Sequence, residues 1–129
     1  MKRLAGRVAL ITGASRGLGA HIARRLAREG MRLALVARNE KALQALAGEL
    51  AAEGHEARVY VADITDTSAC RKLVEAVERE MGGTEILINN AGIERTGHLE
   101  AQTFEESLEV VDVNLLGRYA LSMRSCRAC

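Results

Sequence analysis

Three glycines, Gly13, Gly17 and Gly19, lie close together directly after a short apolar run at 8–12. They open an amphipathic segment at 17–29, so a glycine-rich turn joins an expected strand to an expected helix. Glycine lets the backbone approach a ligand closely, and a helix N-terminus presents N–H groups and a positive dipole end. The turn therefore predicts a site for the pyrophosphate of a dinucleotide, although the G-x-x-x-G-x-G spacing alone also fits an ordinary strand-to-helix turn.

Two arginines indicate which dinucleotide this turn favours. Arg38 follows the second apolar run, about 20 residues after Gly19, where an NAD site carries Asp or Glu for the ribose 2′-hydroxyl. A guanidinium suits a 2′-phosphate instead, and Arg16 in the turn is a second basic group within reach of it. We therefore expect NADP(H) to be favoured over NAD(H). Two alternatives stay open: an NAD(H) site, because Glu40 is close by, and two arginines that are merely solvated.

The pattern of the chain predicts the elements that position these groups. Short apolar runs typical of buried parallel strands lie at 8–12, 33–37, 58–62 and 86–89. Amphipathic helix patterns lie at 17–29, from a cap at Asn39 to Gly54, from Asp66 to Gly82, and from a capping box at Thr103 through Leu115 to beyond Tyr119. This alternation of strands and helices predicts an α/β fold with a parallel sheet and right-handed crossovers.

Composition limits the other classes of function. The chain has 129 residues, of which 48% are hydrophobic and 27% charged, so we expect one globular domain over 1–129. The net charge of +1 indicates no nucleic-acid partner, and no apolar run has the ~20 residues that span a bilayer. The N-terminal apolar stretch is too short for a signal peptide, which favours a cytoplasmic protein. Cys126 and Cys129 have C-x-x-C spacing, but a zinc site needs two more ligands and the three histidines form no ligand pattern, so we expect no metal.

Four motifs, taken together and in this order, resemble the classical short-chain dehydrogenase/reductase family. They are Thr12-Gly13-x-x-x-Gly17-Leu18-Gly19, Ala62-Asp63-Ile64, Asn89-Asn90-Ala91-Gly92 and Val113-Asn114-Leu115-Leu116-Gly117. The resemblance extends to about Met123. It implies a Rossmann-type doubly wound parallel sheet that is incomplete here, with about four strands in the order 3-2-1-4 and four helices.

The resemblance also implies how the cofactor is held. Asp63 would face the adenine ring beside the Ile64 backbone, and Asn90, Ala91 and Gly92 would line the cofactor ribose. Without the resemblance, Asp63 is a turn cap at a strand end and the Asn-Asn-Ala-Gly segment is a turn that ends a strand. The expected cofactor-binding residues are Gly13, Ser15, Arg16, Gly17, Leu18, Gly19, Arg38, Asn39, Asp63, Ile64, Asn90, Ala91 and Gly92.

The catalytic groups that the family uses are largely missing from this chain. Family chemistry needs a Ser, and a Tyr and a Lys four residues apart, with the Tyr as general acid and base. Tyr60 is followed four residues later by Ile64, and Tyr119 by Met123, so neither has the lysine. Asn114, which would anchor a proton-relay water, is the one active-site residue of the family that is present. Whether the chain is itself an enzyme is therefore left open.

The last residues depart from the family pattern. The stretch 124–129 is an atypical tail, and we expect a frameshift, a premature stop or a fragment boundary near Met123, which makes the chain the N-terminal half of a longer protein. Such a truncated domain would be marginally stable. A homo-oligomer could then form through the fourth helix or through the exposed edge of the fourth strand.

Two functions follow as expectations. The leading one is the cofactor-binding portion of an NADP(H)-dependent oxidoreductase that acts on a small-molecule carbonyl or alcohol, with no nucleic-acid or membrane partner. The alternative is a catalytically inactive nucleotide-binding or interaction module, or a truncated gene product. An epimerase-like relative is less favoured, because those proteins usually carry a T-G-x-x-G-x-x-G turn.

Overall fold

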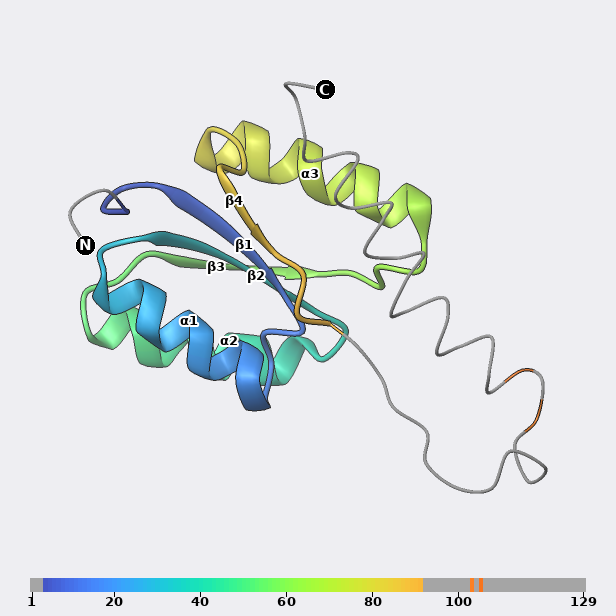
Figure 1. Ribbon diagram of the computed structural model, residues 1–129, viewed down its shortest axis with the longest axis horizontal. Helices are drawn as coiled ribbons and strands as arrows, with labels where there is room; N and C mark the ends of the chain where they lie inside the picture. The colour runs from blue at the N-terminus through green and yellow to red at the C-terminus, as the bar shows by residue number, and fades with distance from the viewer. Residues whose placement is uncertain (1–3, 92–102, 104, 106–129) are drawn as a thin grey trace.

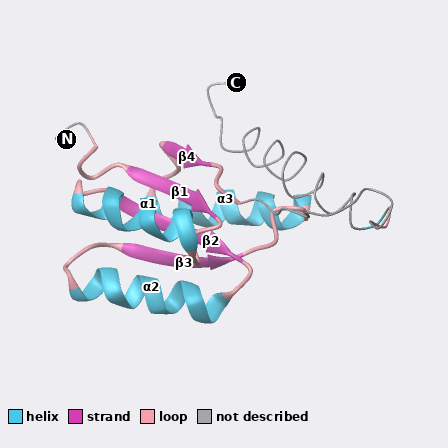
Figure 2. Cartoon of the chain, turned by 60° about the horizontal axis from the view of Figure 1, so that its bottom comes forward, coloured by secondary structure: helices cyan, strands magenta, loops and turns pink. Residues whose placement is uncertain are grey.

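The computed structural model describes residues 4–91, 103 and 105, and in these it forms one parallel sheet with helices on both faces (Figure 1). The elements in chain order are β1 (Val8–Thr12), α1 (Gly17–Arg28), β2 (Arg32–Ala37), α2 (Glu40–Ala52), β3 (Ala57–Val61), α3 (Thr67–Met81) and β4 (Ile86–Ile88). The strands are ordered β3-β2-β1-β4, and Figure 2 shows all of them running in the same direction. Their carboxyl ends therefore meet at one edge of the sheet.

Side chains that alternate along the central strands divide the core into two layers. Ala9 and Ile11 of β1 pack in a cluster with α1 and α2, whereas Val8 and Leu10 pack in a second cluster with α3. Figure 1 shows the same division, with α1 and α2 below the sheet and α3 above it. Because both faces are covered, every residue of β1 is buried, as the unbroken apolar run at 8–12 predicts.

Local signals set the helix ends. The Asn39 side chain accepts a hydrogen bond from the Ala42 N–H at 3.1 Å and caps α2. The Asp66 side chain caps α3 in the same way. Gly82 ends α3 with a φ of +88°, a left-handed conformation that glycine adopts without a Cβ penalty. These ends fall where the sequence places them.

The predicted architecture is confirmed, with one difference in helix number. The parallel sheet has the expected order, and each strand boundary lies within one residue of its predicted position. The structure describes three helices, because the fourth predicted helix, from Thr103 onward, lies almost wholly outside the described residues. No helix in the described ranges is long and apolar enough to span a bilayer.

Candidate dinucleotide site

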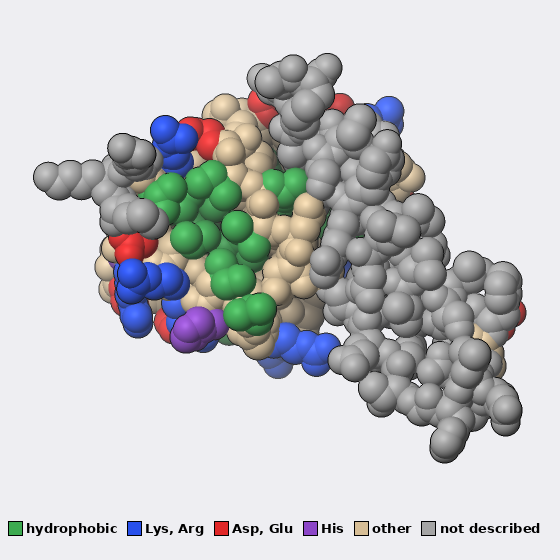
Figure 3. Space-filling view, viewed as in Figure 1, with side chains coloured by type: hydrophobic (Ala, Val, Ile, Leu, Met, Phe, Trp, Pro, Cys, Tyr) green, Lys and Arg blue, Asp and Glu red, His purple; other side chains and the backbone are tan. Residues whose placement is uncertain are grey.

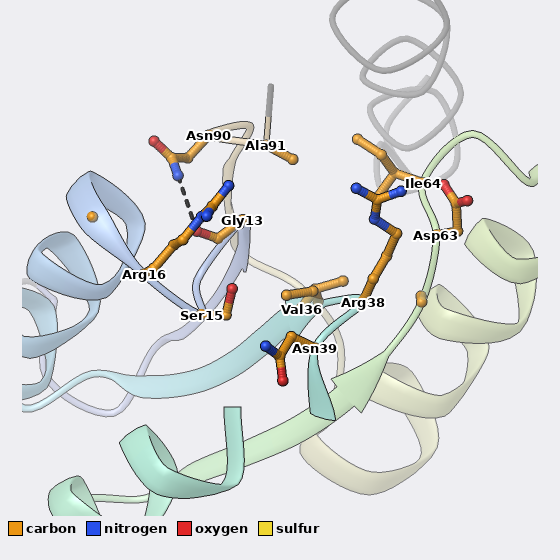
Figure 4. Close-up of a pocket in the computed structure, with 13 residues that line it drawn as sticks. Gly13, Ser15, Arg16, Val36, Arg38, Asn39, Asp63, Ile64, Asn90 and Ala91 are labelled. Carbon is orange, nitrogen blue, oxygen red and sulfur yellow. Dashed lines mark hydrogen bonds between the residues drawn. The ribbon is translucent and has the colours of Figure 1, made fainter. Parts of the chain in front are cut away.

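A pocket of about 410 Å³ opens at the carboxyl edge of the sheet. Figure 4 shows its lining side chains, which come from the turn after β1, from the end of β2 and from the segments that follow β2, β3 and β4. The lining residues are Gly13, Ser15, Arg16, Gly17, Val36, Ala37, Arg38, Asn39, Ala62, Asp63, Ile64, Asn90 and Ala91. In open α/β sheets, ligands bind outside the carboxyl ends of the strands, where the strand order reverses. Here the order reverses at β1, beside this pocket.

The backbone of the glycine-rich turn favours glycine. Gly13 and Gly17 have φ values of +65° and +58°, in the left-handed region. A Cβ on Gly19 would overlap the Gly13 carbonyl oxygen and would lie 2.6 Å from the Asn90 Nδ2. The Ala14 N–H donates to the Val36 carbonyl oxygen at 3.2 Å and fastens the turn to β2. The backbone of Gly19 therefore lies close to the backbone of Gly13 at the mouth of the pocket.

The first turn of α1 differs from that of the other helices. Its N-cap residue, Arg16, makes no side-chain capping bond, and the first turn carries no acidic residue. In contrast, the N-termini of α2 and α3 are capped by Asn39 and Asp66. Since the Arg16 side chain does not cap α1, the N-terminal N–H groups of this helix and its dipole can act on an anion in the pocket.

Thr12 joins the turn to the segment after β4. Its hydroxyl oxygen accepts hydrogen bonds from the N–H groups of Asn90 and Ala91 at 3.1 and 2.9 Å, and the hydroxyl donates to the Ile88 carbonyl oxygen at 3.4 Å. The Asn90 Nδ2 donates to the Gly13 carbonyl oxygen at 3.2 Å, the bond dashed in Figure 4. Thr12 is fully buried, so this hydroxyl is a positioning group that holds two walls of the pocket together.

We expect Thr12→Val to destabilise the protein by roughly 1–3 kcal/mol, because it removes the hydroxyl that accepts hydrogen bonds from the Asn90 and Ala91 N–H groups while it keeps nearly the same shape. The Asn90 N–H keeps its second acceptor, the Ile88 carbonyl oxygen at 3.0 Å. Urea unfolding followed by circular dichroism measures this change in the free energy of unfolding. Thr12→Ser keeps the hydroxyl and serves as the matched control, with most of the stability retained. A loss in Thr12→Val that is no larger than the loss in Thr12→Ser would contradict the stabilising role given to these hydrogen bonds.

The two arginines rise from opposite walls of the pocket in Figure 4. Arg16 lies beside Gly13, and Arg38 extends from the end of β2 toward Ile64 and Asp63. Both are exposed, and neither makes an ion pair with another described residue. The surface arginines Arg24, Arg25, Arg32 and Arg58, by contrast, all pair with glutamates. The two guanidinium groups at the pocket are therefore available to a phosphate.

Asp63 is held in a local turn at the end of β3. Its Oδ1 accepts hydrogen bonds from the Thr65 hydroxyl at 2.7 Å and the Thr65 N–H at 3.0 Å. The bond from the hydroxyl, followed by the N–H bond and the nearby charge of Arg38, lowers the pKa of this carboxyl below its usual value despite partial burial. Asp63 is therefore an anion at neutral pH, and both the turn-capping role and the position in the pocket are observed.

A pH titration should reveal this lowered pKa. Because the folded pKa lies below the unfolded value of about 3.9, the ionised Asp63 stabilises the fold above that pH, and the contribution is lost as pH falls through the folded pKa. Asp63→Asn cannot titrate but still offers an oxygen to Thr65. The difference in unfolding free energy between wild type and Asp63→Asn should be constant above about pH 5 and shrink toward pH 3. If the difference in unfolding free energy between the two proteins does not change with pH, the lowered pKa of Asp63 is contradicted.

The structure gathers ten of the thirteen expected cofactor residues around one pocket. Leu18 and Gly19 belong to the turn without lining the pocket, since Leu18 is 66% exposed and Gly19 is buried beneath the turn. Gly92 and the expected catalytic residue Asn114 lie outside the described residues. Glu40, which left NAD(H) open, sits in the first turn of α2 and is not a lining residue.

Sequence reasoning missed four residues at this site. Thr12 received no role, although a lone hydroxyl at the end of an apolar strand is a signal of a buried polar contact. Val36, Ala37 and Ala62 form part of the lining because β2 and β3 end at the same edge as β1.

Tyr60 has a structural role between β3 and α3. Its hydroxyl donates to the Glu80 carboxylate at 2.6 Å. Partial burial, and then this hydrogen bond, raise the pKa of the phenol, so Tyr60 stays protonated. It does not line the pocket. Within the described residues there is also no cluster of three or more metal-ligating side chains.

Known proteins match this chain over nearly all of its length. The model of the short chain dehydrogenase family matches residues 7–128. The chain is 37% identical to 2,3-dihydro-2,3-dihydroxybenzoate dehydrogenase of Bacillus subtilis over 94% of its length, and 42% identical to gluconate 5-dehydrogenase of Gluconobacter oxydans over 87%. A solved short chain dehydrogenase from Burkholderia cenocepacia, in complex with NADP, superposes with a TM-score of 0.91 at 38% identity over 97% of the chain.

The matches cover only part of those proteins. The chain spans about half the length of the relatives that it matches: 46% of the Bacillus enzyme, 44% of the Gluconobacter enzyme and 51% of the Burkholderia structure. Sequence, sheet order and the glycine-rich turn agree with the family-model match, which extends over most of the chain. This chain belongs to the short-chain dehydrogenase/reductase family.

Proposed function

We propose that this domain binds a nicotinamide dinucleotide, prefers NADP(H) to NAD(H), and forms the cofactor-binding portion of an oxidoreductase. The observation that carries the proposal is the pocket at the carboxyl edge, where an uncapped helix N-terminus and two unpaired arginines face the same space. The NADP held by the Burkholderia relative supports the same assignment. Only an anionic ligand uses all of these features.

The residues present fit such a cofactor. The close approach at Gly19 and the positive φ of Gly13 leave the turn without side chains that would fill the cradle. The turn and the start of α1 would hold the pyrophosphate, and Arg16 and Arg38 would hold the 2′-phosphate. Asp63 and the Ile64 backbone would lie at the adenine, with Asn90 and Ala91 at the ribose of the nicotinamide side. In each case the residue binds and orients a part of the cofactor.

The bound nicotinamide would accept or donate hydride, and the substrate would be a small-molecule carbonyl or alcohol. The protein groups described here would fix the cofactor and neutralise its phosphates. Asn114 would position a proton-relay water, in keeping with its place in the family motif. The family's Ser and Tyr-x-x-x-Lys are absent from this chain, so we infer that the 129 residues bind the cofactor without turning over a carbonyl.

A fluorescence titration of the purified chain with NADPH and NADH tests the binding proposal. The fluorescence of the bound nucleotide should change until the site is saturated. The Kd for NADPH should be at least tenfold below the Kd for NADH, a difference of about 1.4 kcal/mol. Binding of neither nucleotide would overturn the proposal. A parallel assay with carbonyl substrates distinguishes an enzyme from a module that only binds the cofactor. Measurable turnover by the chain alone would contradict the binding module.

A further inference from the structure

The two oxygens of the Asp63 carboxylate lie in different surroundings. Oδ1 accepts hydrogen bonds from the Thr65 hydroxyl at 2.7 Å and from the Thr65 N–H at 3.0 Å. Within the ranges that the structure describes, no group donates a hydrogen bond to Oδ2. Since each carboxylate oxygen accepts about two hydrogen bonds, Thr65 occupies one oxygen and leaves the other to a ligand.

Asp63 also differs from carboxylates that an arginine neutralises. Glu56, for example, pairs with Arg32 at 2.6 Å. Figure 3 shows the same tendency on one face of the molecule, where acidic side chains lie close to basic ones. Asp63 forms no ion pair with another described residue, and Arg38 acts on it through its nearby charge. The Asp63 carboxylate is therefore oriented by a hydroxyl and a backbone N–H, and not by a guanidinium.

The Asp63 carboxylate stands on the wall of the pocket that follows β3. Figure 4 shows it beside Ile64 and near the end of the Arg38 side chain. In the proposed binding mode, the adenine lies against this wall. Adenine is an uncharged base with an amino group as hydrogen-bond donor, and hydrogen bonds weaken steeply when they are poorly aligned. The direction in which Oδ2 points therefore decides how well this wall recognises the base.

The backbone around Asp63 is held by bonds that do not involve the Thr65 hydroxyl. The Asp63 carbonyl oxygen accepts a hydrogen bond from the Asp66 N–H at 3.1 Å, and the Ile64 carbonyl oxygen accepts one from the Cys70 thiol at 3.3 Å. Asp66 in turn caps α3 with its side chain. Loss of the Thr65 hydroxyl should therefore leave the fold of this segment intact.

The freedom that remains belongs to the carboxylate itself. The terminal torsion of an aspartate is broad, so the backbone alone does not set the plane of the two oxygens. The Thr65 N–H holds Oδ1 from the backbone, and the Thr65 hydroxyl holds the same oxygen from a second direction. Its length of 2.7 Å is typical of a charge-assisted hydrogen bond. Together the two bonds restrict the direction of Oδ2.

We propose that Thr65 is a positioning residue for adenine recognition. Its hydroxyl fixes Oδ1 of Asp63 and so directs Oδ2 at the amino group of the base. The proposal rests on the dinucleotide function proposed above, and it adds a residue that does not itself line the pocket. Thr65 acts on the cofactor only through Asp63.

Titrations with NADPH and with its reduced hypoxanthine analogue test this role. The analogue has a carbonyl oxygen in place of the adenine amino group, so it cannot donate to Oδ2 from that position. Thr65→Val removes the hydroxyl, keeps the shape, and should weaken NADPH binding about three- to tenfold, which is the range for one hydrogen bond. The analogue should lose less affinity, so the preference for NADPH over the analogue should fall.

Two matched variants serve as controls for Thr65→Val. Thr65→Ser keeps the hydroxyl and should restore both the NADPH affinity and the preference over the analogue. Thr67→Val makes the same change at an exposed threonine of the first turn of α3 that makes no bond to Asp63, and it should leave both unchanged. A Thr65→Ser variant as weak as Thr65→Val, or an equal loss in Thr67→Val, would overturn the proposal.

A double-mutant cycle shows whether Thr65 acts through Asp63. In an Asp63→Ala background, Thr65→Val should have no further effect on NADPH affinity, because the oxygen that it directs is gone. Losses that add in the double variant would give Thr65 a role of its own and refute the positioning.

An NMR titration of the Asp63 carboxyl in the nucleotide-free chain gives a readout that does not depend on the cofactor. Thr65→Val should raise the pKa of Asp63 toward its ordinary value, because the bond from the hydroxyl is the largest cause of its lowering. An unchanged pKa would refute the hydrogen bond on which the proposal depends. In the nucleotide titrations, a wild-type chain that binds neither nucleotide would overturn the dinucleotide function itself, whereas wild-type binding with no loss in Thr65→Val would overturn only the role of Thr65.

Discussion

Gly19→Ala is expected to weaken dinucleotide binding at least 100-fold, or about 2.7 kcal/mol. A Cβ at this position would overlap the Gly13 carbonyl oxygen and press on the Asn90 side chain at 2.6 Å. The backbone of the turn must then move, because neither the Gly13 carbonyl nor the buried Thr12 behind it can swing aside. Movement of the turn carries the α1 N-terminus away from the phosphate that it would hold.

Gly48→Ala is the matched control for this substitution. Gly48 also lies inside a helix, but a Cβ added there meets no atom within 4 Å. It should leave NADPH affinity unchanged and should stabilise α2 by about 0.5–1 kcal/mol, because alanine has the higher helix propensity. NADPH titration measures the affinity, and thermal unfolding confirms that both variants are folded. An affinity within threefold of wild type for a folded Gly19→Ala variant would contradict the role given to the turn.

The sequence was sufficient for features that depend on neighbouring residues. The cap at Asn39, the stop at Gly82 and the glycine-rich turn each act over a few residues, and all three lie where the pattern predicts. The apolar run of β1 also predicts that this strand is buried on both faces, because no polar residue interrupts the run before Thr12. The family motifs then supplied the strand order, which local pattern alone leaves open.

Features that depend on residues far apart in the chain could not be predicted in the same way. The Thr12 hydroxyl binds Asn90 and Ala91, nearly eighty residues later, so its role exists only once β1 and β4 are paired. The contribution of Val36 and Ala62 to the lining likewise depends on the common edge at which the strands end. Leu18, which belongs to the glycine motif by spacing, points to solvent because it starts the outer face of α1.

Arg38→Asp is expected to abolish or reverse the cofactor preference. The guanidinium that would hold the 2′-phosphate is replaced by a carboxylate that repels it, next to the existing charge of Asp63. We expect NADPH affinity to fall roughly 10- to 150-fold, or about 1.5–3 kcal/mol, which is the range for a charge-assisted hydrogen bond. NADH, which has no 2′-phosphate, should keep its affinity within about threefold, because the pyrophosphate contacts at the turn are unchanged.

Two arginine-to-glutamine variants separate a specific contact of Arg38 with the 2′-phosphate from attraction by the net charge of the protein. Arg38→Gln and Arg28→Gln remove the same charge, but Arg28 lies in the last turn of α1, at the opposite end of that helix from the pocket. Only Arg38→Gln should change the ratio of NADPH to NADH affinity, and high salt should reduce the difference between wild type and this variant. Equal changes in the two variants would mean that net charge attracts NADPH. An unchanged ratio in Arg38→Asp would leave Arg16 as the phosphate ligand, since it is the other arginine that lines the pocket.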